Sequence, residues 1–261
     1  MKILTERNTR TSSVTARPRY SVRLANCAAD VERAQRLRFE VFNLELGEGL
    51  AESHAIGRDV DAFDEVCDHL IVEKEGTDEV VGTYRVQTGT SAADHIGYYS
   101  EREFHFDPYE TIRSQMLELG RACIHSDHRN FGLLLMLWRA IADYATTRGV
   151  RYLVGCSSLT SQDPTEGLAA FAAMRPKHLV RTELRTLPKP EFNIATIAVT
   201  GSNENDGSTN GASSRLLRAY LSIGAKICGP PALDREFGTI DFLTLLDLEA
   251  LPFMVRAHFL R

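Results

Sequence analysis

The segment Glu118-Leu119-Gly120-Arg121 indicates the kind of fold, because it sets an acid and a base inside the strand-like run 116–124. A second segment, Asp59-Val60-Asp61-Ala62-Phe63-Asp64, places three carboxylates just before another strand-like run at 67–72. Charged side chains are rarely placed in buried strands unless they are paired or used. Together the two segments predict a polar site on a sheet, suited to holding a zwitterion and removing its proton.

The composition excludes several classes of protein. A net charge of −5 over 261 residues argues against a general nucleic-acid binder, which usually carries a basic surplus. The five cysteines are scattered and never form a CxxC pair, so we expect a reducing cytoplasm, with neither a disulfide framework nor a bound metal. We expect no bound cofactor either. Residues 1–19 lack the apolar centre of a signal peptide, and no window reaches the ~20 apolar residues of a membrane span. Any contact with the inner membrane is therefore expected to be peripheral.

The order of elements predicts an α/β fold in a single domain, with a mixed central sheet flanked by helices. Apolar alternation and short apolar runs predict strands at 20–25, 69–73, 80–88, 116–124, 152–159, 225–229 and 238–248. Helical spacing predicts helices at 30–46, 131–147, 165–174 and 214–223, the first with Asp30 as its N-cap. Residues 1–19 are predicted to be a flexible tail, 20–261 the domain, and about 201–214 a mobile loop.

The first predicted helix carries a charged residue on its apolar side. Arg38 and Phe42 lie one turn apart, so Arg38 is expected to be partly buried. The acidic loop that follows makes a pair with Asp59, Asp61 or Asp64 attractive. Two roles stay open for these aspartates, namely structural ion pairing and ligand binding.

Strand parity separates the acid from the base in the opening segment. Glu118 and Arg121 would face opposite sides of a regular strand. A β-bulge at Leu119-Gly120 would change that and would free a backbone N–H for an oxyanion. Arg85 lies inside the preceding predicted strand, 80–88. Structural pairing explains each charge singly, but their combination favours a functional site.

The start of the helix at 131–147 offers a site for an anion. Arg129-Asn130-Phe131-Gly132 follows a strand, and a helix N-terminus presents unpaired N–H groups to phosphate. An ordinary capped helix explains the same residues, and a single glycine makes the motif weak on its own.

Taken together, these motifs resemble the acyltransferases of the GNAT superfamily. The closest resemblance is to the L-ornithine N(alpha)-acyltransferases, often labelled hemolysin-like, which are related to the acyl-homoserine-lactone synthases. It extends in order over roughly residues 20–250 and rests on Arg36-Leu37-Arg38-Phe39, Phe42, Asp59 to Asp64, Cys67-Asp68-His69-Leu70, Val81 to Arg85, Glu118 to Arg121, Leu137-Trp138, Gly155-Cys156-Ser157-Ser158, Tyr220, Gly224-Ala225, Asp234, Phe237 and Asp241-Phe242-Leu243.

The resemblance implies a GNAT-like acyltransferase fold and an acyltransferase activity. A (3-hydroxy)acyl chain would move from acyl carrier protein to the α-amine of ornithine, the first step of ornithine lipid synthesis. The loop at Arg129 lacks the second small residue of coenzyme-A-using relatives, which favours acyl-phosphopantetheine on acyl carrier protein as the co-substrate. The same chemistry on glycine or another amino acid, an acyl-homoserine-lactone-type synthase, and a membrane-active hemolysin remain as alternatives.

The site residues implied by the resemblance have named roles. Glu118 is expected to be the base, with Arg121 beside it in the catalytic pair. The residues expected to bind substrate are Arg38, Phe42, Asp59, Asp61, Asp64 and Arg85, with Arg85 or Arg121 on the acceptor carboxylate and the aspartates on the second amine of ornithine. Those expected to bind phosphopantetheine or acyl carrier protein are Arg129, Asn130 and Gly132. An apolar tunnel for the acyl chain could be lined by Phe42, Phe63, Phe104, Leu134 and Trp138, and acidic acyl carrier protein could dock on Arg33, Arg36, Arg129 and Arg151.

Overall fold

The structure is a computed structural model that describes residues 18–194 and 215–259. The mobile loop predicted at about 201–214 and residues 1–17 of the predicted tail lie outside this described part. The strands are β1 (Tyr20–Leu24), β2 (Asp68–Lys74), β3 (Val80–Thr88), β4 (Met116–Ile124), β5 (Tyr152–Leu159), β6 (Lys226–Ile227), β7 (Ala232–Asp234) and β8 (Thr239–Asp247).

These strands form one mixed sheet in the order β1-β2-β3-β4-β5-β8-β6, with β7 also paired to β8. The pairing of β4 with β5 is parallel, and the other pairs in the described residues are antiparallel. The predicted mixed sheet flanked by helices is therefore confirmed. The predicted strands 80–88, 116–124 and 152–159 agree with β3, β4 and β5 to the residue.

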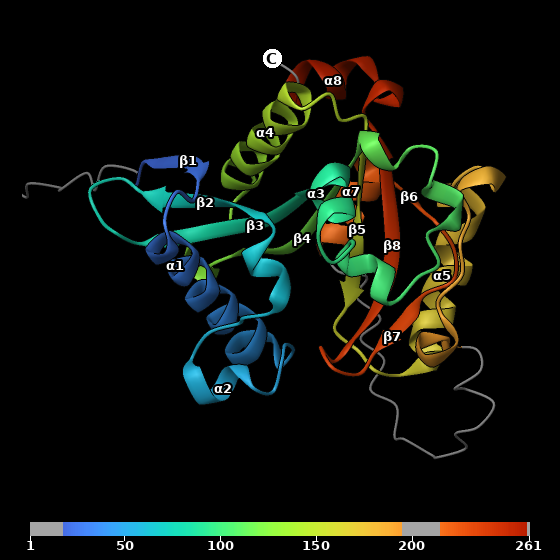
Figure 1. Ribbon diagram of the computed structural model, residues 1–261, viewed down its shortest axis with the longest axis horizontal. Helices are drawn as coiled ribbons and strands as arrows, with labels where there is room; N and C mark the ends of the chain where they lie inside the picture. Colours follow the sequence, from blue (N-terminus) through green and yellow to red (C-terminus); the bar gives the residue numbers. More distant parts are fainter. Residues whose placement is uncertain (1–17, 195–214, 260–261) are drawn as a thin grey trace, which may run out of the picture.

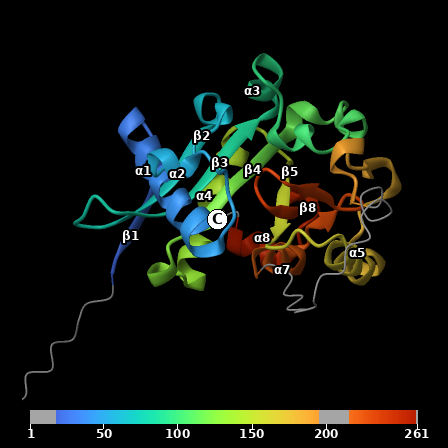
Figure 2. The same cartoon turned by 90° about the horizontal axis from the view of Figure 1, so that it is seen from below.

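Helices cover both faces of the sheet (Figures 1 and 2). The α-helices are α1 (Ala28–Phe39), α2 (Ser53–Ile56), α3 (Gly89–Asp94), α4 (Phe131–Thr147), α5 (Pro164–His178), α7 (Arg215–Ile223) and α8 (Phe253–Phe259). The π-helix η1 (Glu40–Leu46) continues α1, and the 3₁₀ turns are η2 (Ala62–Glu65), η3 (Tyr99–Arg102), η4 (Asp107–Tyr109), η5 (Arg113–Gln115), η6 (Ser126–His128), η7 (Thr182–Leu184), η8 (Pro190–Phe192) and η9 (Leu248–Ala250).

The alternation of side chains along β2 shows which helix covers each face of the sheet. Leu70 and Val72 pack in the cluster that includes α4, whereas Ile71 between them packs in the cluster that includes α1. The prediction that Asp30 caps the first helix is wrong. The helix begins after Cys27, and Asp30 instead lies in the first turn, where it pairs with Arg23 at 2.5 Å.

The sheet divides between β4 and β5. The two strands pair at only three positions, from Met116 opposite Tyr152 to Glu118 opposite Val154. Beyond that point they diverge, and Figure 1 shows β2 and β3 running across the picture while β5 and β8 run nearly vertically. At the vertex a Cβ on Gly155 would lie 2.2 Å from the carbonyl oxygen of Leu119. Only glycine fits there without moving the backbone.

Besides the 3₁₀ turns, four short elements lie where the sequence pattern predicts none, namely α2, α3, β7 and α8. Among the described residues, no helix has both the length and the apolar character needed to cross a membrane.

Candidate active site

A bulge in β4 brings the two charged residues of the opening segment to one face. Arg85 of β3 lies opposite Gly120 and Thr83 lies opposite Cys123, so two residues of β4 face the single residue between them. One of the two, Arg121, has φ = 49°, the left-handed region that costs a non-glycine residue roughly 1–2 kcal/mol. The predicted bulge is therefore present, but it lies at Arg121-Ala122 rather than at Leu119-Gly120.

Three arginines and three aspartates form one buried ionic network. Its members are Arg38, Asp59, Asp61, Asp64, Arg85 and Arg121. Arg38 lies at its base and is completely buried rather than partly buried as predicted. Its Nε is 2.8 Å from Asp59, and its two terminal nitrogens donate to Asp64 at 2.9 and 2.6 Å. The pairing expected between Arg38 and the acidic loop is thus present.

The other two arginines close the network. Arg85 donates to Asp61 at 2.5 Å and to Asp64 at 3.0 Å, and Arg121 lies 2.9 Å from Asp61 and 3.2 Å from Asp59. Burial opposes ionisation of Asp61, but Arg85 and Arg121 outweigh it, so the pKa of Asp61 is lowered. All three aspartates are therefore held as partners of arginines.

Glu118 lies beside this network without belonging to it. Its Oε2 accepts from the backbone N–H of Tyr99 at 2.7 Å, and its Oε1 accepts from the N–H and the hydroxyl of Ser100 at 2.8 and 2.5 Å. Burial raises the pKa of Glu118 above its ordinary value, although the Ser100 and Tyr99 hydrogen bonds and the charge of Arg85 act in the opposite direction. A carboxyl with a raised pKa suits proton transfer near neutral pH.

A cavity of about 780 Å³ opens where the sheet divides. Its charged and polar walls include Arg85, Glu118 and Arg121 from one half of the sheet, and Cys156, Ser158 and Asp241 from the other. Of the residues predicted to bind substrate, Arg85 and Phe42 line the cavity. Arg38 and the three aspartates lie behind the wall, so this geometry does not support direct contact of those four residues with an acceptor.

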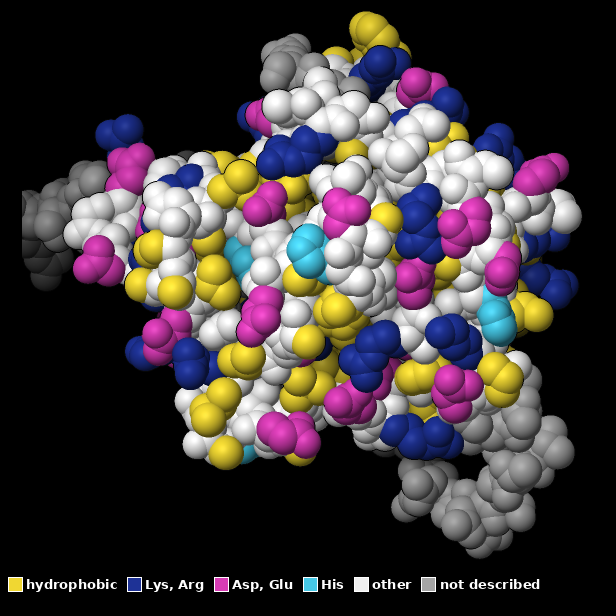
Figure 3. All heavy atoms as spheres, in the orientation of Figure 1, with side chains coloured by type: hydrophobic (Ala, Val, Ile, Leu, Met, Phe, Trp, Pro, Cys, Tyr) yellow, Lys and Arg dark blue, Asp and Glu magenta, His cyan; other side chains and the backbone are white. Residues whose placement is uncertain are grey.

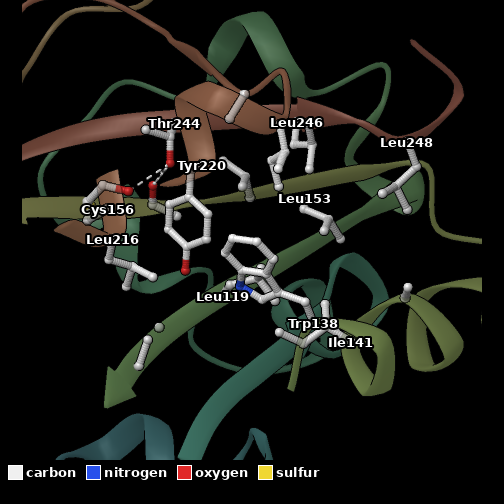
Figure 4. Close-up of a pocket in the computed structure, with 18 of the residues that line it drawn as sticks. Leu119, Trp138, Ile141, Leu153, Cys156, Leu216, Tyr220, Thr244, Leu246 and Leu248 are labelled. Carbon is white, nitrogen blue, oxygen red and sulfur yellow. Dashed lines mark hydrogen bonds between the residues drawn. The ribbon is translucent and has the colours of Figure 1, made fainter. Parts of the chain in front are cut away.

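An apolar chamber of about 90 Å³ adjoins this cavity on the side of α4 and α7. The residues that border both are Leu119, Gly120, Arg121, Ala122, Cys156, Ser157 and Leu216. Figure 4 shows the rings of Trp138 and Tyr220 pointing into the chamber, with Leu153, Leu246 and Leu248 around it.

The predicted acyl tunnel is only partly reproduced. Trp138 lines the chamber, and Phe42 and Leu134 line the cavity. Phe104 lines neither space, because it is buried in a core cluster with side chains of η4, β5 and β8. Phe63 also lines neither, and its ring packs against Arg85 and Tyr99.

The N-terminus of α4 lies at the mouth of the cavity. Arg129 and Asn130 both line the cavity, whereas Gly132 does not. The side chain of Asn130 caps α4 by accepting from the N–H of Leu133 at 3.0 Å. Both terminal nitrogens of Arg129 bind the carboxylate of Glu45.

The arginines proposed to dock acyl carrier protein all have acidic partners. Arg33 pairs with Asp30 and Glu73, Arg36 with Glu32, Arg129 with Glu45, and Arg151 with Asp247 and Glu249. On the face drawn in Figure 3, basic and acidic side chains are interspersed. That face therefore carries no extended field of positive charge.

Sequence reasoning missed the residues that surround Glu118. Tyr99, Ser100 and Glu103 lie in the irregular stretch between β3 and β4, which has no periodic pattern to place them. Asp241 carried a readable signal, since it is an acid inside the otherwise apolar run of β8. The same argument that singled out Glu118 would have found it.

Known proteins similar to this chain point in one direction. A family model described as acetyltransferase (GNAT) domain matches residues 37–139. An L-ornithine N(alpha)-acyltransferase of Rhodobacter capsulatus is 31% identical over 248 residues, which is 93% of this chain and 95% of that protein. Another from Rhizobium meliloti is 29% identical, over 87% of this chain and 79% of that protein.

Solved structures agree at the level of the fold. A coenzyme-A-dependent acyl-homoserine lactone synthase, BjaI, with MTA has a TM-score of 0.50 and 17% identity, over 91% of this chain and 86% of that one. The GNAT-like fold expected from the sequence is confirmed.

Proposed function

The chain belongs to the family of the L-ornithine N(alpha)-acyltransferases within the GNAT acyltransferases, and on that premise we propose that it moves a (3-hydroxy)acyl chain from acyl carrier protein to the α-amine of ornithine. The product is an amide, which is the first intermediate of ornithine lipid synthesis.

One observation carries the proposal, namely the convergence of three features at the vertex of the sheet. The Glu118 carboxylate lines the cavity, the β4 bulge lies three residues further along the strand, and the apolar chamber adjoins both. Amide formation from a thioester requires a base, a holder for the oxyanion and a place for the chain. These three features supply them in one place.

In the proposed reaction the neutral amine attacks the thioester carbonyl, and Glu118 accepts the proton that the amine loses. Backbone N–H groups at the bulge, around Arg121 and Ala122, hold the tetrahedral oxyanion. Collapse of this intermediate breaks the C–S bond and completes the amide. The departing phosphopantetheine thiolate then takes up a proton.

No covalent intermediate on the enzyme is needed. Cys156 lines the cavity, but burial and the nearby carboxyl of Glu103 raise the pKa of its thiol well above the ordinary value. A protonated thiol is a poor nucleophile. We therefore assign Cys156 to the wall of the site.

The α-carboxylate of the acceptor is assigned to the arginines of the cavity wall. Among the described residues, the hydrogen bonds of Arg85 come from Nη1, and a guanidinium carries five N–H donors in all. Arg85 and Arg121 line the cavity on the same side as Glu118. A carboxylate bound there would bring the α-amine next to the base.

The donor is assigned to the mouth of the cavity, where the N-termini of α4 and α7 lie. Asn130, Phe131 and Arg215 line this part, and Phe131 is 71% exposed. A phosphopantetheine arm entering there would carry its thioester toward the bulge and its acyl chain toward the apolar chamber. Gly132 and Arg129 would act at the first turn of α4.

Purified protein, 3-hydroxyacyl carrier protein and an equimolar mixture of amino acids test the proposal. We expect N-acylornithine by mass spectrometry, with one thiol released for each amide formed, and little product when acyl-coenzyme A replaces the carrier protein. Acylation of glycine or another amino acid in place of ornithine would show that ornithine is not the acceptor. Membrane lysis by the Glu118→Gln protein, with no acyl transfer by the wild type to any amine, would favour a hemolysin.

A further inference from the structure

Four carboxyl groups around the cavity stand outside the arginine–aspartate network. They are Glu48, Glu103, Glu118 and Asp241, and the structure gives none of them an arginine, lysine or histidine within ion-pair distance among the described residues. The three arginines and three aspartates of the network cancel each other's charge. The four carboxyls therefore have no cation from the described part of the chain at ion-pair distance, and burial, which raises the pKa of each, opposes their ionisation. A bound cation would offset that cost, so the site favours a cationic ligand.

Two of these carboxyls, Glu103 and Asp241, approach each other. A carboxylate oxygen of Glu103, the Sγ of Cys156 and a carboxylate oxygen of Asp241 all lie within 4.8 Å of one another. Asp241 of β8 pairs with Ser158 of β5, so it belongs to the half of the sheet beyond the vertex. Glu103 follows directly after η3, the turn whose Ser100 holds Glu118.

Each of the two has a buried oxygen without a partner. Oε1 of Glu103 and Oδ1 of Asp241 accept no hydrogen bond within the described part of the chain. The residues are only 1% and 3% exposed, and Asp241 lines the cavity. An unpaired buried acceptor is costly, so such groups are normally satisfied by a ligand or by another protein group.

We propose that Glu103 and Asp241 form the subsite for the side-chain ammonium of the acceptor, which makes the enzyme selective for a diamino acid. This inference rests on the proposed function. An ammonium group supplies three N–H donors and one positive charge, which match the two unpaired oxygens and the absence, among the described residues, of an ion-paired basic side chain beside them.

The spacing fits an acceptor with two amines. The hydroxyl of Ser100 donates to Glu118 at 2.5 Å and lies 3.5 Å from the Sγ of Cys156, which in turn lies 3.9 Å from Glu103. One serine and one cysteine therefore separate the base from the acidic pair. The α-amine at Glu118 and the second amine at Glu103 and Asp241 would be joined by a short aliphatic chain.

A divalent cation is the competing occupant, because two carboxyls and a thiol could ligate one. Ligation would require the Cys156 thiolate, whose formation burial opposes in the metal-free protein by raising the pKa of the thiol well above its ordinary value. Asp241 lines the cavity, so a substrate in the cavity can reach this member of the pair directly. These observations favour the ammonium group.

Acceptor selectivity tests the subsite. The ratio of kcat/KM for ornithine to that for norvaline, which has the same chain without the second amine, is measured for the wild type and for Asp241→Asn and Glu103→Gln. We expect the wild-type ratio to be about 100 or more and each variant to lower it at least about 30-fold. The two substitutions lie in different parts of the fold, so the test still stands if one of the variants fails to fold. Asp247→Asn, which removes a carboxylate at the far end of β8, should leave the ratio unchanged.

Each result has a distinct meaning. If the wild type acylates ornithine but both variants keep its preference over norvaline, the subsite is wrong and the proposed function stands. A wild type that acylates norvaline as well as ornithine also overturns the subsite. If the wild type acylates neither, the proposed function fails and the subsite falls with it. Loss of activity on dialysis against EDTA, restored by Zn²⁺ or Mn²⁺, would show that Glu103 and Asp241 bind a metal ion and would overturn the ammonium subsite.

Discussion

Arg38 and Asp64 form a two-pronged, buried ion pair with N···O distances of 2.9 and 2.6 Å. The pair joins α1 to η2 and sets the position of the whole acidic loop. Since Arg38 also contacts Asp59, its removal would take one arginine from two buried carboxylates and leave the network of two arginines and three aspartates unbalanced in charge.

Arg38→Met is therefore expected to lower the free energy of unfolding by about 3–5 kcal/mol. Urea denaturation would measure the change. Arg36→Met is a matched control two residues earlier on α1, where the side chain is exposed and, within residues 18–194 and 215–259, has Glu32 as its one ion-pair partner. We expect that control to change stability by about 0.5 kcal/mol. Equal losses for the two variants would contradict a special role for the buried pair.

Glu118→Gln is expected to lower kcat about 10²–10⁴-fold, because the amide cannot accept the proton of the amine. The pKa of Glu118 is raised by burial, so the base form is lost on the acid side of that raised pKa and activity falls there. The variant should lack this acid limb in its pH–rate profile.

Ser100→Ala separates the role of the base from that of its surroundings. The variant removes a hydrogen bond that stabilises the ionised form of Glu118. The acid limb should therefore move to higher pH without disappearing. An acid limb that persists in Glu118→Gln would assign the proton transfer to another group.

Asp241 should make stability depend on pH in an unusual direction. Burial, the main cause, raises its pKa from 3.8 to about 6 in the folded protein. The native state then holds this proton more tightly than the unfolded chain. The stabilisation is present below the unfolded pKa and is lost as pH rises through about 6.

The free energy of unfolding of the wild type, relative to Asp241→Asn, should therefore fall between pH 4 and pH 7 by an amount on the order of 2–3 kcal/mol. Denaturation of both proteins at several pH values would measure it. A difference that is constant over this range would show that Asp241 titrates normally.

Filling the apolar chamber should shorten the acyl chain that the enzyme accepts. Ala142 of α4 lines the chamber, so Ala142→Leu is expected to lower kcat/KM for long-chain donors about 10-fold or more relative to short-chain donors. Ala140→Leu, which adds the same volume on the same helix outside the chamber, is the control. An unchanged chain-length profile in Ala142→Leu would place the chain elsewhere.

Gly155→Ala should be strongly destabilising, because its Cβ would overlap the backbone oxygen of Leu119 at 2.2 Å. We expect a loss of at least about 2–3 kcal/mol in urea denaturation. Gly120→Ala, on the adjacent strand, meets no atom within 4 Å and should change stability by no more than about 1 kcal/mol. Similar losses of unfolding free energy in the two variants would mean that the backbone at the vertex can move to accommodate a Cβ.

The regular elements were predictable because their periodicity is local. The 17-residue helix α4 has the predicted bounds of 131–147, and its apolar spacing and the glycine after it are visible in the sequence. The three-residue strand β7 has too few positions to show alternation. The helix α8 is separated from β8 only by η9 and two further residues, and apolar residues continue across this stretch, which hides the boundary.

The candidate site was predictable only where charge is out of place in a strand. Glu118 and Arg121 stood out for that reason. Their partners did not, because the pairing of Asp61 with Arg121 joins residues 60 positions apart and depends on the bulge. The residues that hold Glu118 come from η3, whose position is set by tertiary packing and not by any repeat in the sequence.

The contact between Gly155 and Leu119 also limits how such an enzyme can diversify. The two halves of the sheet meet there backbone against backbone. Exchanging side chains therefore cannot change the angle between β4 and β5. Substrate range can change along the walls, at positions such as Ala142 or Asp241, while the point of bond formation stays where it is. Related enzymes are thus expected to keep the geometry of the vertex and to differ in the side chains of the cavity walls.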